Sequence, residues 1–238
     1  GGLKPEVAVL VATIRALKMH GGVGKNDLKK EDLAALKKGL VNLKRHVRNL
    51  KSFGVNVVVG INKFSADTDA EVALVQDYCK KLGVKAVESD HWGNGGEGAE
   101  DLAHAVVEAV EAPNEGFHPL YTDRMGLWNK IHTIATQIYD ADDIIADKKV
   151  RDQIKNLDEN DGHFPICIAK TQYSFTTDPS LKGAPSNHVM PIREVRLSAG
   201  AEFLVVICGD IMTMPGLPSV PAANAIYVGE DGRIAGLF

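Results

Sequence analysis

The 238-residue sequence predicts an α/β protein: a parallel sheet in its first part, then one or two smaller α+β domains. Residues 7–13 and 55–61 are runs rich in β-branched side chains, typical of strands buried on both faces, and residues 84–89 form a weaker run. Helical patterns separate the three runs, an order that indicates parallel pairing. After "APNEG" the alternation of strands and helices gives way to helical patterns followed by several strand-like runs. This change predicts domains over residues 1–112 and 113–238.

Each predicted helix of the first domain has its own signals. Between the first two strands, apolar residues recur at steps of three and four, and Gly54 follows them. This stripe consists of Leu33, Leu36, Leu40, Leu43, Val47 and Leu50. The basic residues opposite it fit either a solvated face or a polyanion site. After the second strand, Thr68 and Glu71 have the spacing of a capping box, and Gly83 follows the helix. A further helix is predicted over residues 99–111.

The second predicted domain contains both helical and strand-like patterns. Helical patterns run around residues 127–139 and 148–157. Three strand-like segments follow: "PICIAK", "MPIREVRLS" and "EFLVVICG". The turn "EDG" between "AIYV" and "RIAGLF" predicts a terminal hairpin.

Composition excludes several classes of function. A net charge of -4 gives no electrostatic reason to expect nucleic acid or an acidic membrane as partner. No apolar run approaches ~20 residues, so no membrane span is expected, and the N-terminus lacks a signal-peptide pattern. Cys79, Cys167 and Cys208 are widely spaced, which predicts reduced thiols in a cytoplasmic protein. The eight histidines lack ligand spacing, so no metal site is expected.

Ligands of open parallel sheets bind outside the carboxyl ends of the strands. Three predicted loops follow those ends: "RALKMHGGVG", "NKFSADTD" and "SDHWGNGGEG". If the strands are neighbours, the loops line one crevice. In the first loop, Arg15, Lys18 and His20 precede Gly21 and Gly22, which fits an anion site or, equally, a turn with solvated charges.

The second and third loops each offer one aromatic ring. Asn62 begins a segment like the Asn-Lys-x-Asp motif of G proteins, but Ser65 stands at the aspartate position and no phosphate loop is present. Phe64 fits either a ligand-facing ring or ordinary core packing. Trp92, set among glycines, favours the first interpretation, because two rings on neighbouring loops could hold a planar heterocycle between them.

Together these segments resemble the formate–tetrahydrofolate ligase family over essentially the whole chain. The resemblance rests on "VATIRALKMHGG", "INKFSADTD", "WGNGGEGA", "KTQYSF", "REVRLSAGAEF", "GDIMTMPGLP" and "DGRIAGLF", which occur in the family's order. It implies a P-loop-NTPase-like nucleotide domain and a reaction in which ATP with Mg²⁺ activates formate as formyl phosphate. The tetrahydrofolate amine then attacks, giving 10-formyltetrahydrofolate. A monovalent cation and a homo-oligomeric state of the intact enzyme are further implications.

The resemblance also implies roles for particular residues. It places the pterin between Phe64 and Trp92, although Ser65 departs from the proline frequent in the family. Arg15, Lys18, His20 and Asn62, with Gly21 and Gly22, are expected near the reacting centre, without assigned catalytic roles.

The family's phosphate loop and main catalytic residues would precede this segment. We therefore expect the C-terminal portion of a ligase that is inactive alone. The alternative is a non-catalytic folate-binding module; a G-protein-like module lacks the required motifs.

Overall fold

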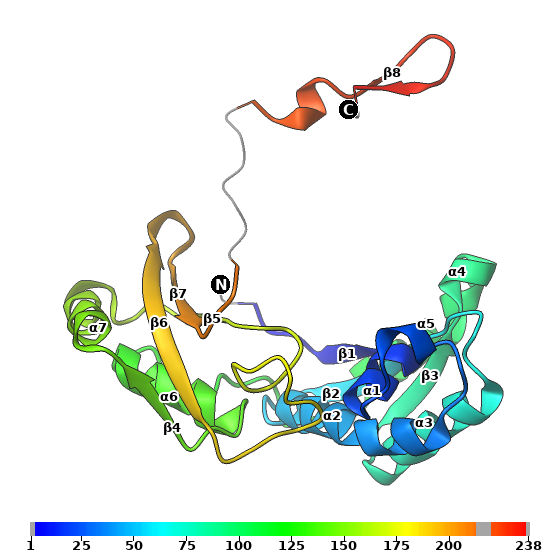
Figure 1. Ribbon diagram of the computed structural model, residues 1–238, viewed down its shortest axis with the longest axis horizontal. Coiled ribbons are helices and arrows are strands. Elements are labelled where there is room, and N and C mark those ends of the chain that lie inside the picture. Colours follow the sequence, from blue (N-terminus) through cyan, green and yellow to red (C-terminus); the bar gives the residue numbers. More distant parts are fainter. Residues whose placement is uncertain (1–2, 213–219, 237–238) are drawn as a thin grey trace.

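The computed structural model of the protein describes residues 3–212 and 220–236 (Figure 1). The first region is built on a parallel sheet with the strand order β1-β2-β3. Its strands are β1 (Val7–Ala12), β2 (Asn56–Asn62) and β3 (Lys85–Ser89). The sequence predicts all three, and they are neighbours, as a shared crevice requires.

Five helices accompany this sheet. They are α1 (Ile14–His20), α2 (Leu33–Lys51), α3 (Asp69–Lys81), α4 (His91–Asn94) and α5 (Glu100–Glu111). Short 3-10 turns lie at Lys25–Asp27 and Glu97–Ala99. The predicted α2, α3 and α5 are confirmed, as is the capping box of α3. Gly54 and Gly83, which follow α2 and α3 as predicted, have φ values of 76° and 67°.

The prediction of plain loops after β1 and β3 was wrong. Residues 14–20 form α1, because Thr13 caps it by accepting a hydrogen bond from the backbone N–H of Ala16 (3.1 Å). Residues 91–94 form α4, which Asp90 caps through the N–H of Gly93 (3.0 Å). The sequence contains both capping residues. The helices that follow them are, however, too short to show the apolar periodicity that predicts a helix.

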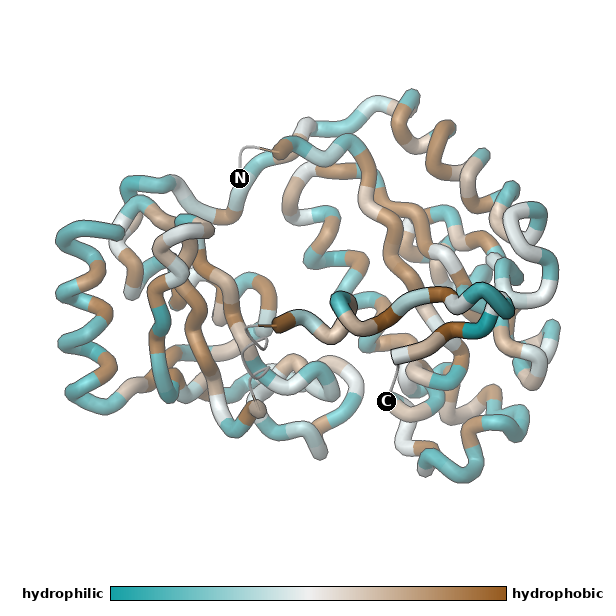
Figure 2. The backbone as a smooth tube through the Cα atoms, turned by 90° about the horizontal axis from the view of Figure 1, so that it is seen from above, coloured by the Kyte–Doolittle hydropathy of each residue, from teal (hydrophilic) through white to brown (hydrophobic). Residues whose placement is uncertain are grey.

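The core of the first region lies between the sheet and helices α1, α2 and α3. Its largest fully buried side chains include Ile14, Leu36, Leu40, Leu43 and Ile61. Figure 2 shows apolar strands in this sheet and helices along which hydrophobic and hydrophilic residues alternate, and the leucines of α2 belong to the core. The leucine stripe of α2 therefore faces the sheet, as its periodicity predicts.

The other face of β1 differs from the prediction of a strand buried on both faces. Val9 and Val11 are 42% and 64% exposed. On that side α5 packs mainly over β3 and β2, and β1 is the outer strand of the order. A β-branched run indicates a strand but does not say whether a helix covers each of its faces.

The second region holds a four-stranded mixed sheet with the order β4-β6-β7-β5. Its elements are α6 (Leu127–Gln137), β4 (Asp143–Ala146), α7 (Lys148–Asp161), β5 (Ile166–Ala169), β6 (Val189–Ser198) and β7 (Phe203–Cys208). β6 and β7 are antiparallel. β4 pairs in parallel with β6, and β5 pairs in parallel with β7. The mixed α/β class is confirmed. β4 is not predicted, because four residues carry too little periodicity.

The second core lies between this sheet and helices α6 and α7, around Leu127, Ile131, Met190 and Leu204. Among the residues that the structure describes, it shares none with the first core. The predicted boundary at residue 112 stays a prediction.

The two regions meet along α2. Arg45 and Arg48 both form ion pairs with Asp140, at 2.6 and 2.9 Å. Asn49 donates to the carbonyl of Ile138 (2.9 Å), and Asn42 donates to that of Gly183 (2.8 Å). Asn42, Arg45 and Asn49 are buried, whereas the side chain of Arg48 is about half exposed, so polar residues on one face of α2 hold the second region in place.

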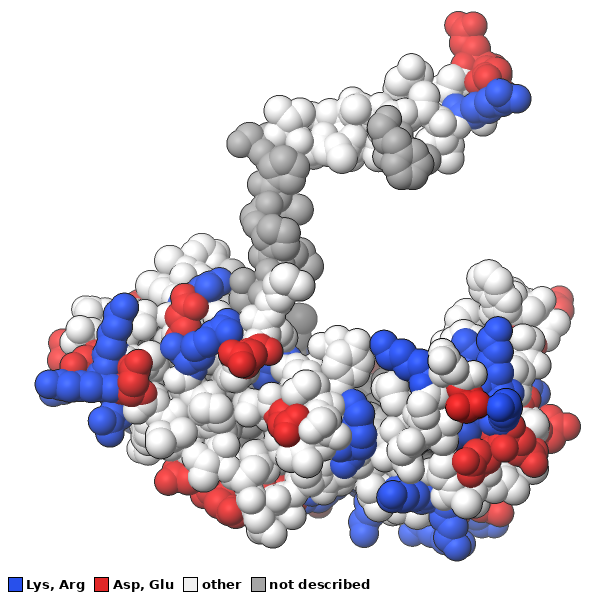
Figure 3. Space-filling model, viewed as in Figure 1, with Lys and Arg blue, Asp and Glu red and all other residues white. Residues whose placement is uncertain are grey.

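The chain ends in the predicted hairpin, formed by β8 (Tyr227–Val228) and β9 (Ile234–Ala235). Most of the segment "GDIMTMPGLP" lies outside the described residues. Further 3-10 turns span Ala199–Ala201 and Ala222–Asn224. None of the helices in the described ranges combines the length and apolar character that crossing a membrane requires. On the face of the molecule in Figure 3, basic and acidic side chains are interspersed over both regions.

Candidate functional site

The carboxyl edge of the first sheet brings three segments of chain together. Asn62 at the end of β2 pairs with Ser89 of β3, and the N–H of Lys63 donates to the carbonyl of Ser89 (3.1 Å). On the other side, Ala12 of β1 pairs with Ile61. The turn after β2 therefore lies between α1 and α4, and the three segments start from one edge, where parallel sheets bind ligands.

The turn after β2 fixes Phe64 in place. The N–H of Phe64 donates to the carboxylate of Asp67 (2.9 Å), and the N–H of Asp67 donates back to the carbonyl of Phe64 (2.9 Å). The half-buried ring of Phe64 lies under the guanidinium of Arg15, whose Cζ is 4.0 Å from the ring centroid. This contact joins α1 to the turn.

Asp67 is a buried carboxylate that sequence reasoning missed. Burial raises the pKa of Asp67 above its ordinary value, while the hydrogen bond from Phe64 acts in the opposite direction. Among the described residues, neither Oδ1 of Asp67 nor the buried Nε of Arg15 has a hydrogen-bond partner. The serine and aspartates of "SADTD" are residue types that favour turns, which is the local signal for this segment.

Trp92 stands out from the same edge. It lies on α4 and is 86% exposed, unusual for a large aromatic side chain. Asp90 anchors the short helix through the N–H of Gly93 (3.0 Å) and the amide of Asn94 (3.1 Å). The N–H of Asp90 donates to the carbonyl of Gly98 (2.9 Å), and a Cβ on Gly98 would lie 2.2 Å from the carbonyl oxygen of Asp90. The loop is thus a fixed support for an exposed indole.

Lys18 is part of the fold rather than a free cation. Its side chain is completely buried and its Nζ lies 2.8 Å from the carboxylate of Glu71, which is also completely buried. The ammonium also donates to the carbonyl of Lys30 (2.8 Å). Glu71 in turn accepts from the N–H groups of Asp32 (3.1 Å) and Thr68 (3.2 Å). The pair ties α1 to α3, and its charges balance each other.

The remaining residues of the first motif face α2 and the second region. His20 accepts a hydrogen bond at Nδ1 from the N–H of Gly183 (3.1 Å). A Cβ on Gly21 would lie 1.9 Å from the carbonyl oxygen of Ala35, and Gly22 has a φ of +104°. Gly21 is therefore required by the close approach of the end of α1 to α2, and Gly22 by the positive φ of the turn that follows α1.

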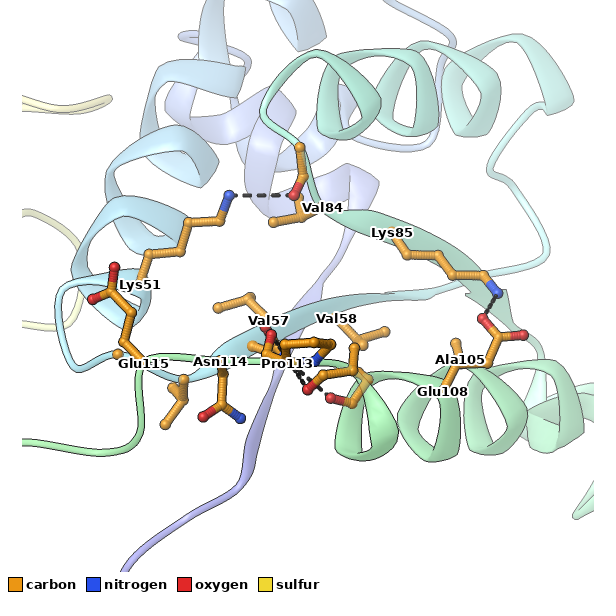
Figure 4. A pocket seen from close by; sticks show the side chains of 16 residues that line it. Lys51, Val57, Val58, Val84, Lys85, Ala105, Glu108, Pro113, Asn114 and Glu115 are labelled. Carbon is orange, nitrogen blue, oxygen red and sulfur yellow. Dashed lines mark hydrogen bonds and ion pairs between the residues drawn. The ribbon is translucent and has the colours of Figure 1, made fainter.

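A hollow of about 520 Å³ lies at the opposite, amino edge of this sheet (Figure 4). Its two lysines pair with their neighbours: Lys85 with Glu108 (2.6 Å), and Lys51 with the carbonyls of Leu82 (2.9 Å) and Gly83 (3.2 Å). Ligands of parallel sheets bind at the other edge, so we do not take this hollow as the site.

These features define an α/β protein whose parallel sheet carries a fixed turn with Phe64 and an exposed Trp92 at its carboxyl edge. The family model described as formate–tetrahydrofolate ligase matches residues 1–238. The chain belongs to this family.

Three similar curated relatives, each called formate–tetrahydrofolate ligase, illustrate the match. That of Granulibacter bethesdensis is 62% identical over 238 residues, that of Pelagibacter ubique 60% over 237, and that of Sinorhizobium fredii 58% over 238. Each alignment covers 99–100% of this chain but only 42–43% of the relative. The chain therefore spans about two fifths of the length of these relatives.

Proposed function

We propose that this chain is the folate-slot segment of an ATP-dependent formate–tetrahydrofolate ligase. In the proposed reaction, ATP with Mg²⁺ phosphorylates formate, and the amine of tetrahydrofolate attacks the formyl phosphate to give 10-formyltetrahydrofolate. The segment supplies a wall of the pterin site and does not turn over alone. The proposal includes a P-loop-NTPase-like nucleotide domain, a monovalent cation, a homo-oligomer and a cytoplasmic location for the intact enzyme.

The observation that carries the proposal is the exposed Trp92 on α4, at the same sheet edge as Phe64, in a chain of this family. A pterin is flat and aromatic, and stacking on a ring contributes about 0.5–1.5 kcal/mol beyond buried area. Arg15 already lies against the ring of Phe64, so the ligand would use the ring's free surface or displace the guanidinium.

The exposed side of β1 supports the idea of a segment. Parallel sheets are almost always covered on both faces, yet Val9 and Val11 are largely exposed. A further part of a ligase packed there would bury them. The share of each relative that the chain covers fits the same idea.

Isothermal titration calorimetry tests the folate slot. We expect the chain to bind tetrahydrofolate, Trp92→Ala to lose this binding, and Trp92→Phe, which keeps a ring, to retain most of it. Trp128→Phe is the matched control, because Trp128 packs on the second core. Equal binding by Trp92→Ala and the unmodified chain would remove Trp92 from the slot.

Two further measurements test the segment. A titration with MgATP should give no heat, and an assay for 10-formyltetrahydrofolate should show no product. Adding the part of the Granulibacter bethesdensis ligase that this chain does not match should restore turnover. Turnover by the chain alone would contradict the proposal. Folate binding without restored turnover would favour the alternative, a non-catalytic folate-binding module.

A further inference from the structure

A cavity of about 220 Å³ lies between the two regions, away from the carboxyl edge of the first sheet. One wall comes from α1 and α2, with His20, Asn42 and His46. The other comes from Tyr139 and the segment 170–175 after β5. We call it the junction cavity. Its walls are held by buried contacts of α2, among them Asn42 with Gly183.

Lys170 is a half-buried cation in this cavity. Its Nζ donates to the carbonyls of Thr171 (2.9 Å) and Ser174 and lies 4.9 Å from the ring centroid of Tyr139. An ammonium has three donors, so one remains for a ligand or water. Within the described ranges, no carboxylate lies at ion-pair distance from Lys170. Burial lowers its pKa to about 8.

The groups around Lys170 are mostly basic. Asp140, the ion-pair partner of both Arg45 and Arg48, already has two cations. The titratable and charged groups facing this cluster are His20 from α1, Arg45 and His46 from α2, Asp140 and Asp142 before β4, Lys182 and His188 before β6, and Cys208 from β7. Burial lowers the pKa values of His20, His46 and His188, and neighbouring basic groups add to this, although Asp142 and Asp140 oppose the effect at His188.

Polar nitrogens of Arg45 and His188, which lie near the cavity but outside its lining, also lack partners among the described residues. In the part of the chain that the structure describes, the buried Nη1 of Arg45 and both ring nitrogens of His188 form no hydrogen bond. Unpartnered buried polar atoms are costly unless water or a ligand satisfies them. A site with surplus positive charge and free donors is suited to a negatively charged oxygen ligand.

We propose that the junction cavity binds a small oxyanion, a phosphate or carboxylate group on a compact ligand. The 220 Å³ would hold about seven water molecules at ~30 Å³ each, which limits the ligand to a small molecule. Lys170 supplies a positive charge in the cavity. The bound anion supplies the negative charge that no carboxylate of the described residues places at ion-pair distance. This site is separate from the folate slot, so the result of testing it does not depend on whether the proposed function is correct.

Histidine NMR spectra of the full chain test the proposal without mutation. Inorganic phosphate and succinate are titrated separately, and we expect saturable shifts of the ring signals of His20 and His46 with at least one of them. The exposed His91 and His104 serve as internal controls. A response to one anion alone identifies the preferred oxyanion. No saturable shift of His20 and His46, or equal shifts of all four, would overturn the proposal.

Substitution of Lys170 gives a second test. Lys170→Met should weaken binding of the effective anion at least tenfold, whereas Lys155→Met, at an exposed position of α7, should leave it unchanged. Circular dichroism checks that the variants fold. If Lys170→Met does not fold, the pH dependence of anion binding by the unmodified chain tests the role of Lys170. The affinity for the anion should fall by up to tenfold per pH unit above about 8, because Lys170 loses its proton there. Affinity independent of pH in this range would contradict a role for Lys170.

Discussion

The guanidinium of Arg15 lies over the aromatic ring of Phe64 in the candidate site, with its Cζ 4.0 Å from the ring centroid. Arg15 belongs to the signature segment that begins at β1, and Phe64 to the turn after β2. One contact therefore links two of the three segments at the carboxyl edge. It gives Arg15 a defined task, which is to hold the ring of Phe64 in position.

This contact predicts coupling between the two side chains. Arg15→Met and Phe64→Leu should each lower the free energy of unfolding, and the double variant should lose less than the sum. A cation over an aromatic face contributes about 0.5–2 kcal/mol, depending on desolvation, so a coupling energy at the lower end of this range is expected. Urea denaturation of the four proteins measures it. Strict additivity would mean that the stacking contributes nothing.

The ion pair of Lys18 and Glu71 predicts a large effect of breaking it. Both side chains are completely buried, 2.8 Å apart, so Lys18→Met leaves an uncompensated carboxylate in the core. We expect a loss of about 3–5 kcal/mol in the free energy of unfolding, and partial recovery when Glu71→Gln is added. Lys30→Met, which breaks the exposed pair with Asp27, is the control and should not shift the denaturation midpoint. A similar midpoint for both lysine variants would refute the structural role of Lys18.

The packing of α1 on α2 predicts an effect opposite to helix propensity. In an exposed helix, Gly→Ala stabilises by about 1 kcal/mol. A Cβ on Gly39 of α2, however, would lie 1.8 Å from the carbonyl oxygen of Leu17, which is in α1. Gly39→Ala should therefore destabilise by about 1–3 kcal/mol or more, because the helices must separate. Gly24→Ala is the control, because among the described residues no atom beyond its chain neighbours would lie within 4 Å of the added Cβ. Stabilisation by Gly39→Ala would show that the helices are not in this close contact.

The sequence predicts the parallel sheet well because long periodic elements carry the signal. The leucine stripe of α2 and the Thr68–Glu71 capping box are local patterns, and the structure confirms both. The short elements α1, α4 and β4 escape detection, since four to seven residues hold too few repeats of any period.

The candidate site was predictable in its location but not in its contacts. Strand order places Phe64 and Trp92 at one edge once the strands are taken as neighbours. Nothing in the spacing of Lys18 and Glu71, fifty-three positions apart, indicates that they pair, because the pairing depends on how α1 and α3 pack. The junction cavity also escapes, because its walls come from residues of both regions.

Three histidines near the contact between the regions predict acid sensitivity. Burial lowers the pKa values of His20, His46 and His188 below the ordinary 6.5. The unfolded chain therefore binds more protons than the folded chain between the lowered values and 6.5, and stability falls as the pH falls through this window. Below the lowered pKa values the three histidines are protonated in both the folded and the unfolded chain, and the stability that depends on their neutral form is fully lost.

Urea denaturation at a series of pH values measures this dependence. His20→Gln should flatten the slope below pH 6.5, because glutamine can accept the N–H of Gly183 without titrating. His104→Gln, at an exposed position of α5, is the matched control and should keep the original slope. Since His20 binds Gly183 through an unprotonated Nδ1, its protonation should also loosen the contact between the regions. Identical slopes for both variants would mean that His20 does not contribute.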